Sequence, residues 1–137
     1  MAALFPLEVH TPTRIFFSEP IEVIVLTLID GEAAVYANHS HFTAPVVPCL
    51  FKIKDKDGQW KSAFTAEGIL QVGDLRTVLL SDAAEWPDEI DYERAKAALE
   101  RAEETINMGT FKFETEAAVS ALQRAKMRIK VSEEGKL

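Results

Sequence analysis

The stretch EIDYERAKAALERAEE, residues 89–104, decides how the C-terminal part of this chain folds. Asp91 stands where an N-cap residue belongs, because its carboxylate can accept a hydrogen bond from the first turn of a helix. The apolar residues that follow recur at helical spacing: Ala95, Leu99, Ala102 and Ile106. Gly109 can adopt the left-handed conformation that ends many helices. The stretch therefore predicts an amphipathic helix between Asp91 and Gly109.

A second stripe of apolar residues at helical spacing lies farther along the chain: Ala118, Leu122, Ala125 and Ile129. The short link between the two stripes predicts an antiparallel helical hairpin. Both stripes are narrow and rich in alanine, so they offer little apolar area, and burial contributes only about 25 cal/mol per Å². We therefore expect a hairpin that is marginally stable by itself and able to rearrange.

The sequence upstream of Trp86-Pro87 has a different character. It carries β-branched and aromatic residues in short runs, separated by turn residues such as Asp30-Gly31. This spacing predicts eight to ten short strands in a sandwich or flattened barrel. The expected fold is α+β in two segregated parts, a β-sandwich over residues 1–86 and a helix–turn–helix over residues 87–137.

Three details of the sandwich can be predicted at the level of single elements. Glu19-Pro20 is expected to separate a strand over 14–18 from a strand over 21–28, because proline interrupts strand pairing. Residues 46–54 read as one strand. The large aromatic side chains are expected in the core: Phe51, Trp60 and Phe64.

Composition excludes several classes of protein. The 137 residues carry a net charge of −7, which argues against a nucleic-acid partner. The one cysteine, Cys49, excludes an internal disulfide and favours a reducing compartment. No apolar run approaches the roughly 20 residues that a membrane-spanning helix needs. The first 14 residues lack the basic and apolar regions of a secretory signal, so we expect a soluble chain with no direct membrane insertion.

Arginines recur on both predicted helices. Asp91, Arg94 and Arg101 fall in one sector of the first helix, and Arg124 and Arg128 fall in one sector of the second. Guanidinium groups suit phosphate oxygens, and neighbouring alanines leave room for a flat ring. The alternative is a solvated face with ion pairs within each helix.

The segment from residue 117 to residue 131 has no acidic residue and four basic ones: Arg124, Lys126, Arg128 and Lys130. Such a segment on an acidic protein can dock on an acidic partner surface. Favourable placement of cations near the negative end of the helix dipole explains it equally well.

No constellation for catalysis or metal binding is evident. His39 and His41 would share one side of a strand, but no third ligand is nearby, so no metal site is predicted. The chain has no nucleophile–base arrangement and no glycine-rich phosphate loop. We therefore expect a protein that is not an enzyme.

Three segments in this order resemble one family, the epsilon subunit of bacterial and chloroplast-type F-type ATP synthases. LEVHTPTRIFFSEPIEVIVL (7–26) is similar to the family's opening strands, and DGEAAVYANHSHFTAPV (30–46) to its Gly-Glu…Val…His segment. AEGILQVGDLRTVLLSDAAEW (66–86) is similar to its last sandwich strands and linker. The two predicted helices resemble the family's C-terminal pair.

This resemblance implies a ten-stranded sandwich in the rotating central stalk of a proton-translocating synthase. The expected partners are the gamma subunit, the ring of c subunits and the catalytic alpha and beta subunits. The helices would act as a mobile brake on ATP hydrolysis, without catalysis of their own. The expected location is peripheral, on the cytoplasmic side of a bacterial membrane, with the plastid thylakoid as the alternative.

The resemblance also implies a ligand for the arginines, because in some bacterial members of the family the folded hairpin binds ATP without hydrolysing it. ATP is then a regulatory ligand rather than a required cofactor. The residues implied for binding it are Glu85, Ile90, Asp91, Arg94, Arg101, Arg124 and Arg128. The basic residues from Arg124 to Lys130 would meet an acidic loop of the beta subunit when the hairpin is extended.

Glu32 and His39 are the c-ring contacts that the resemblance implies. Around them the chain departs from the family, because Asn38 stands at a usual glycine and His41 at a usual proline. Two other functions stay open at this point. One is a free-standing ATP-sensing module, and the other is a β-sandwich adaptor whose hairpin is only an interaction surface.

Overall fold

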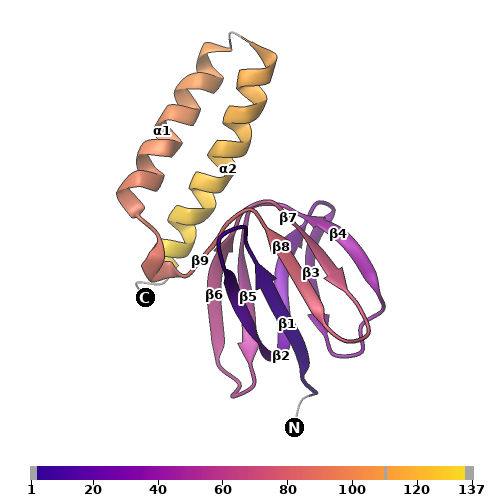
Figure 1. Ribbon diagram of the computed structural model, residues 1–137. Coiled ribbons are helices and arrows are strands. Elements are labelled where there is room, and N and C mark those ends of the chain that lie inside the picture. Colours follow the sequence, from indigo (N-terminus) through magenta and orange to yellow (C-terminus); the bar gives the residue numbers. More distant parts are fainter. Residues whose placement is uncertain (1–2, 110, 135–137) are drawn as a thin grey trace. The chain divides into compact units, whose positions relative to one another are not determined.

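The computed structural model describes residues 3–109 and 111–134. The chain divides into two compact units, and the boundary in the sequence falls between Glu85 and Trp86. Strands occupy the first unit and helices the second, as the arrows and the coiled ribbons show (Figure 1). The predicted fold class, a β-sandwich followed by a helix–turn–helix, is therefore confirmed.

The described part of the first unit contains nine strands, one fewer than the family resemblance implied. They are β1 (Phe5–His10), β2 (Ile15–Leu28), β3 (Gly31–Tyr36), β4 (Phe42–Val46), β5 (Cys49–Asp55), β6 (Trp60–Thr65), β7 (Gly68–Val72), β8 (Thr77–Ser81) and β9 (Ala84–Glu85). Their ladder runs β1-β8-β7-β4-β2 and returns to β1 through the β1–β2 pair. This closed circuit is the flattened barrel, and β5, β6 and β9 extend from β2 on one side.

The separation of two strands at Pro20 was wrong, because β2 runs unbroken for 14 residues. Its first half pairs with β1, where Pro20 lies opposite Pro6, and its second half pairs with β3 and β5. The β2–β5 register shifts between Ile21 and Val23. Pro20 therefore lies where the strand leaves one ladder for another, a place where a missing N–H costs little.

Two further details differ from expectation. Residues 46–54 are not one strand: β4 ends at Val46 and β5 begins at Cys49, because the first pairs with β7 and the second with β2 and β6. Trp60 is not in the core but 54% exposed. It opens β6 beside the turn, and the Lys54 ammonium lies 6.0 Å from the centre of its ring.

Large apolar side chains fill the core of the sandwich. Those that are fully buried come from seven strands: Leu7, Val9, Ile21, Val23, Ile24, Leu26, Val35, Phe51, Ile53, Phe64, Leu70 and Leu79. One buried polar bridge joins β6 to β8, where the Thr65 hydroxyl donates to Ser81 Oγ over 2.7 Å. The Ser81 hydroxyl donates in turn to the carbonyl of Ala83 over 2.8 Å, so each of the two buried hydroxyls has a hydrogen-bond acceptor.

The second unit begins with a short 3₁₀ turn, η1 (Pro87–Glu89), followed by α1 (Tyr92–Met108) and α2 (Lys112–Glu134). Asp91 caps α1 as predicted, since its Oδ1 accepts from the backbone N–H of Arg94 over 3.1 Å. Gly109 ends α1 with φ of 57°, which is the predicted left-handed conformation. Among the described residues, neither helix is long and apolar enough to cross a membrane.

The two helices pack against each other along a seam of alanines. Four of its members are buried: Ala95, Ala102, Ala118 and Ala125. Leu99, Leu122 and Ile129, which sequence periodicity placed in the same stripes, are only half-buried. Alanine brings helix backbones close but removes little apolar area from water, so the seam stabilises the hairpin weakly.

Candidate nucleotide site and partner surfaces

The alanine seam fixes how residues of α1 and α2 face each other. The chain reverses between Met108 and Lys112, so Ala95 lies at the level of Ala125 and Ala102 at the level of Ala118. At a rise of about 1.5 Å per residue, Arg94 falls midway between Arg124 and Arg128 along the hairpin axis. Three of the four arginines are therefore within one helical turn of each other in height.

These arginines also lie on the same side of the hairpin. A helix turns by about 100° per residue. Viewed down the axis of α1, Arg94 and Arg101 therefore lie roughly 90° around the helix from the seam. Arg124 and Arg128 stand about the same angle before the seam on α2. When two helices are antiparallel, residues that lie at the same angle from the seam, counted in the same direction around each helix, face the same side of the pair. Helical geometry thus places all four predicted arginines on a single side of the hairpin, which we call the arginine face.

Exposure on the arginine face differs between the helices. Arg94 and Arg101 on α1 are exposed, whereas Arg124 and Arg128 on α2 are half-buried and already engaged by neighbouring groups. Arg101 lies about five residues, or roughly 7.5 Å, beyond the level of Arg124. The face is therefore long enough for several phosphate oxygens rather than for one.

The remaining residues predicted for ATP have other local roles. Ile90 is 9% exposed, so it contributes packing rather than a polar contact. One oxygen of Asp91 is engaged in capping α1. Glu85 is the last residue of β9 and belongs to the first unit, whereas the other six belong to the second. Six of the seven residues therefore belong to the second unit.

The four basic residues from Arg124 to Lys130 form two rows on α2 and not one patch. Arg124 and Arg128 lie on the arginine face, whereas Lys126 and Lys130 are offset by two residues, or about 200° around the helix. Lys126 and Lys130 are exposed. A partner that contacts all four must therefore surround α2.

Glu32 and His39 are at opposite ends of β3. Glu32 is the second residue of the strand, beside the turn from β2, and His39 lies three residues beyond its last residue. At about 3.3 Å per residue, Glu32 lies roughly 13 Å from Tyr36, the last residue of the strand, and His39 follows after a turn. The structure does not bring these two candidate contacts together.

The departures from the family near His39 are accommodated locally. Asn38 has φ of 63°, the left-handed conformation that glycine would supply and that asparagine tolerates better than most residues. The imidazole of His39 forms a 2.8 Å hydrogen bond with the carbonyl of Ser40 through Nδ1. The β3–β4 link thus keeps a tight turn without the glycine.

The His39 end of the sandwich holds a cavity of about 390 Å³ that sequence reasoning missed. The start of β1, the β3–β4 link and the turn from β7 to β8 line it. His41 Nε2 lies 2.7 Å from Asp74 Oδ1 across its rim. No local sequence pattern predicts this contact, because residues 41 and 74 are adjacent only in the folded sheet.

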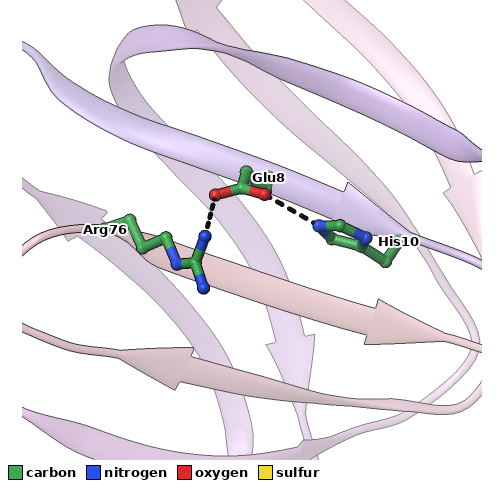
Figure 2. Close-up of polar contacts among 3 residues, drawn as sticks. All are labelled: Glu8, His10 and Arg76. Atoms are coloured by element: carbon green, nitrogen blue, oxygen red, sulfur yellow. Dashed lines mark hydrogen bonds and ion pairs between the residues drawn. The ribbon is translucent and has the colours of Figure 1, made fainter.

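A second polar cluster joins β1 to the same turn (Figure 2). Glu8 Oε2 accepts from Arg76 Nη1 over 2.7 Å, and Glu8 Oε1 lies 2.9 Å from His10 Nε2. Hydrogen bonds from His10 and Arg76 hold the pKa of Glu8 below its ordinary value. The alternation of Glu8 and His10 along β1 was the one local signal that they share a side.

Among the described residues, no group of three or more His, Cys, Asp or Glu side chains could hold a metal ion. The four arginines of the arginine face are cationic. What this arrangement can do chemically is hold an anionic ligand or dock on an acidic surface.

Comparison with known proteins defines the class. The family model for the β-sandwich domain of the ATP synthase delta/epsilon chain matches residues 4–87, and the model for its long α-helix domain matches residues 88–133. The chain belongs to the ATP synthase delta/epsilon chain family.

Several relatives match along nearly the whole chain. The ATP synthase epsilon chain of Caldicellulosiruptor bescii is 45% identical over 98% of this chain and 97% of its own length. That of Caldanaerobacter subterraneus is 44% identical, covering 96% of each. A relative from Acetobacterium woodii, named as sodium ion specific, is 41% identical over 81% of this chain and 84% of its own.

Solved structures show the same fold at low sequence identity. A chain of the Euglena gracilis mitochondrial ATP synthase, in a structure of OSCP, F1 and c-ring, has a TM-score of 0.79 at 20% identity and covers 99% of this chain and 82% of its own. A chain of the Tetrahymena thermophila central stalk and c-ring has a TM-score of 0.66 at 12% identity and covers 96% and 98%.

Proposed function

We propose that this chain is a non-catalytic epsilon-type subunit of an F-type ATP synthase. The observation that carries the proposal is the match of both domain models in order, together with relatives above 40% identity over nearly the full length. As such a subunit it couples the central stalk to the rotating ring. Its partners are gamma, the c subunits and the catalytic alpha and beta subunits.

The location that follows is peripheral, on a membrane-bound complex, at the cytoplasmic side of a bacterial plasma or inner membrane. The chain itself contributes the contact with the rotor and not the ion path. The coupling ion therefore belongs to the membrane part, where we propose protons, although one relative is named as sodium ion specific.

The hairpin is the regulatory part of this proposal. Its alanine seam stabilises the folded pair weakly, so a small free-energy input can move it between a folded and an extended state. The extended state would present Arg124, Lys126, Arg128 and Lys130 to an acidic loop of the beta subunit and slow ATP hydrolysis. Because these residues form two rows, extension away from α1 is what exposes both to one partner.

ATP is the ligand that the arginine face fits best. Its polyphosphate needs several guanidinium donors, and Arg94, Arg124 and Arg128 stand within one turn of each other while Arg101 extends the row. Asp91 and Ile90 hold the start of α1 in place by capping and packing, and Glu85 precedes the hairpin. Binding to the folded hairpin alone stabilises it by mass action, by about 2.7 kcal/mol at a concentration 100 times Kd.

Glu32 and His39 remain our candidate c-ring contacts. Since they stand at opposite ends of β3, they need not contribute equally to the same contact. Charge reversal at Glu32 and substitution of His39 should then weaken the association with purified c-ring to different extents. Undiminished association in both variants would contradict their role as c-ring contacts.

Calorimetric titration of the full chain with ATP tests the nucleotide site. We expect saturable binding that Arg94→Ala weakens strongly. Lys126→Ala is the matched control, because it removes the same charge at nearly the same level but from the opposite side of the hairpin, and binding should survive. No binding up to millimolar ATP, or equal loss in both variants, would contradict the arginine face as the site.

Co-purification separates the stalk subunit from the two alternative functions. Co-expressed with the gamma subunit of the same synthase, the chain should form a stable complex. A free-standing ATP sensor would bind ATP but not gamma, and a sandwich adaptor would bind neither. Within the assembled enzyme, charge reversal at Arg124 and Arg128 together should relieve inhibition, and unchanged inhibition would exclude their docking role.

A further inference from the structure

The buried side chains of the helical hairpin are unevenly distributed along its length. Within residues 86–109 and 111–134, they are the four alanines of the seam, Ser132 and two branched aliphatic residues, Ile90 and Val131. Val131 is fully buried, and Ile90 is 9% exposed. Both aliphatic residues lie at one end of the hairpin, which we call the foot, because Ile90 precedes the cap of α1 and Val131 belongs to the last turn of α2.

The two aliphatic residues of the foot stand at similar levels. Ala95 lies at the level of Ala125 in the seam, and Val131 follows Ala125 by six residues, or about 9 Å along α2. Ile90 precedes Ala95 by five residues, in the same direction along the hairpin. α2 also contacts η1, the turn that ends just before Ile90, and Figure 1 shows the end of α2 beside that turn. The foot therefore joins the end of α2 to η1 and to the start of α1.

The opposite end of the hairpin, which we call the tip, lacks such packing. Its large apolar side chains, Met108, Phe111 and Phe113, are all exposed. The buried residues nearest the tip are Ala102 and Ala118. Because the free energy of burial grows with the apolar area removed from water, the contact between the helices is weakest at the tip and strongest at the foot.

We propose that Val131 and Ile90 form a latch at the foot of the hairpin, which opens from its tip and extends only when Val131 leaves its buried position. The latch stabilises the folded state, and the alanine seam adds a smaller share. The regulatory meaning of this inference rests on the proposed function, in which the extended hairpin is the inhibitory state. The latch itself is a property of the isolated chain.

The latch reverses the order in which the parts of a helix normally open. The last turn of a helix ordinarily frays, because few contacts hold its amides. The last turn of α2 instead carries Val131, the most deeply buried side chain of the hairpin among the described residues. We therefore expect the amides of residues 129–132 to exchange more slowly than those of residues 117–122, which lie farther from either end of α2.

Amide hydrogen exchange of the full chain without nucleotide tests the latch. Val131→Ala removes two buried methyl groups, so the exchange of residues 129–132 should become about tenfold faster or more. Val119→Ala is the matched control, because it makes the same change on the same helix at a side chain that is 43% exposed. Both variants gain the same helix propensity, and the control should alter exchange at the foot by no more than about twofold.

Ile90→Val is a milder test of the other member of the latch. It removes one carbon from a buried side chain and should speed exchange of residues 129–132 by about two- to tenfold. The amides of β2 report whether the sandwich stays folded, and their exchange should be unchanged in all three variants.

Equal exchange at the foot in Val131→Ala and Val119→Ala would overturn the latch. Slower exchange of residues 117–122 than of residues 129–132 in the unaltered chain would also overturn it. In the assembled synthase, Val131→Ala should deepen the inhibition of ATP hydrolysis, because a larger share of the hairpin is extended. Faster exchange in the isolated chain with unchanged hydrolysis in the synthase would support the latch and overturn the regulatory role of the hairpin instead.

Discussion

The two units of this molecule are stabilised by different means. The sandwich buries Phe51, Phe64 and a set of branched aliphatic side chains in a ladder that closes on itself, whereas the hairpin is joined along a seam whose fully buried members are mostly alanine. Buried apolar area is the main favourable term in folding, and alanine contributes least of it. The comparison shows how one chain can carry a firmly packed unit beside a weakly packed one.

The largest expected effect lies in the sandwich. Phe64 is completely buried, and Phe64→Ala should lower the free energy of unfolding of the first unit by about 3–5 kcal/mol through lost burial and the cavity left behind. Chemical denaturation, followed by the fluorescence of Trp60 in a background where Trp86→Phe removes the other tryptophan, measures this.

Phe113→Ala is the counterpart in the hairpin. Phe113 is 81% exposed, so its loss should change stability by less than about 0.5 kcal/mol. If the two phenylalanines proved equally important, the contrast between the units would be lost.

The seam should be sensitive in the opposite sense, to added volume. Ala125→Leu places three extra carbons where two helices meet closely, and should destabilise the hairpin by about 1–3 kcal/mol. Helix content by circular dichroism and the exchange of α1 amides report this. Ala97→Leu, at an exposed position of α1, should have no such cost. A stabilised hairpin in Ala125→Leu would mean that the seam is loosely and not closely packed.

A smaller effect is expected at the start of α1. Asp91→Ala removes the N-cap hydrogen bond to Arg94, which should cost about 1 kcal/mol of hairpin stability in the absence of nucleotide. Asp88→Ala, which removes an exposed carboxylate just upstream, is the control. Equal losses in the two variants would assign the effect to charge rather than to capping.

Acid pH should act on the sandwich through two carboxylates. The pKa of Glu8 is lowered by hydrogen bonds from His10 and Arg76, and that of Asp55 by backbone hydrogen bonds from Gln59 and Asp57 and by the contact with Lys61. A lowered folded-state pKa gives stability that is present above the ordinary values, 4.5 and 3.8, and is lost as pH falls below them.

Acid titration of unfolding measures this contribution. Glu8→Gln and Asp55→Asn should each flatten the decline of sandwich stability below about pH 4.5. A decline that is unchanged in both variants would mean that other carboxylates govern it.

Local chemistry made the hairpin predictable from sequence. Asp91 and Gly109 are caps whose roles depend on a few adjacent residues, and helical spacing alone was enough to locate the buried alanines of both helices. The sandwich was predictable as a class but not in its pairing. Pro20 reads as a strand break, yet tertiary pairing carries β2 through it, because the proline lies where the strand changes partners.

The parts that sequence could not predict are those made by distant residues. Glu8 meets Arg76 across 68 positions, and His41 meets Asp74 only after β4, β7 and β8 have assembled. The separation of Glu32 from His39 was likewise invisible, because their closeness in sequence hides the length of the strand between them.

Amide hydrogen exchange of the full chain, with and without ATP, tests the central contrast most directly. We predict that the α1 and α2 amides exchange through openings of lower free energy than those of β2, β5 and β8, and that ATP slows the hairpin amides while leaving the sandwich unchanged. Equal protection in both units without ATP, or slowing of both units alike when ATP is added, would contradict a firm docking unit joined to a ligand-stabilised hairpin.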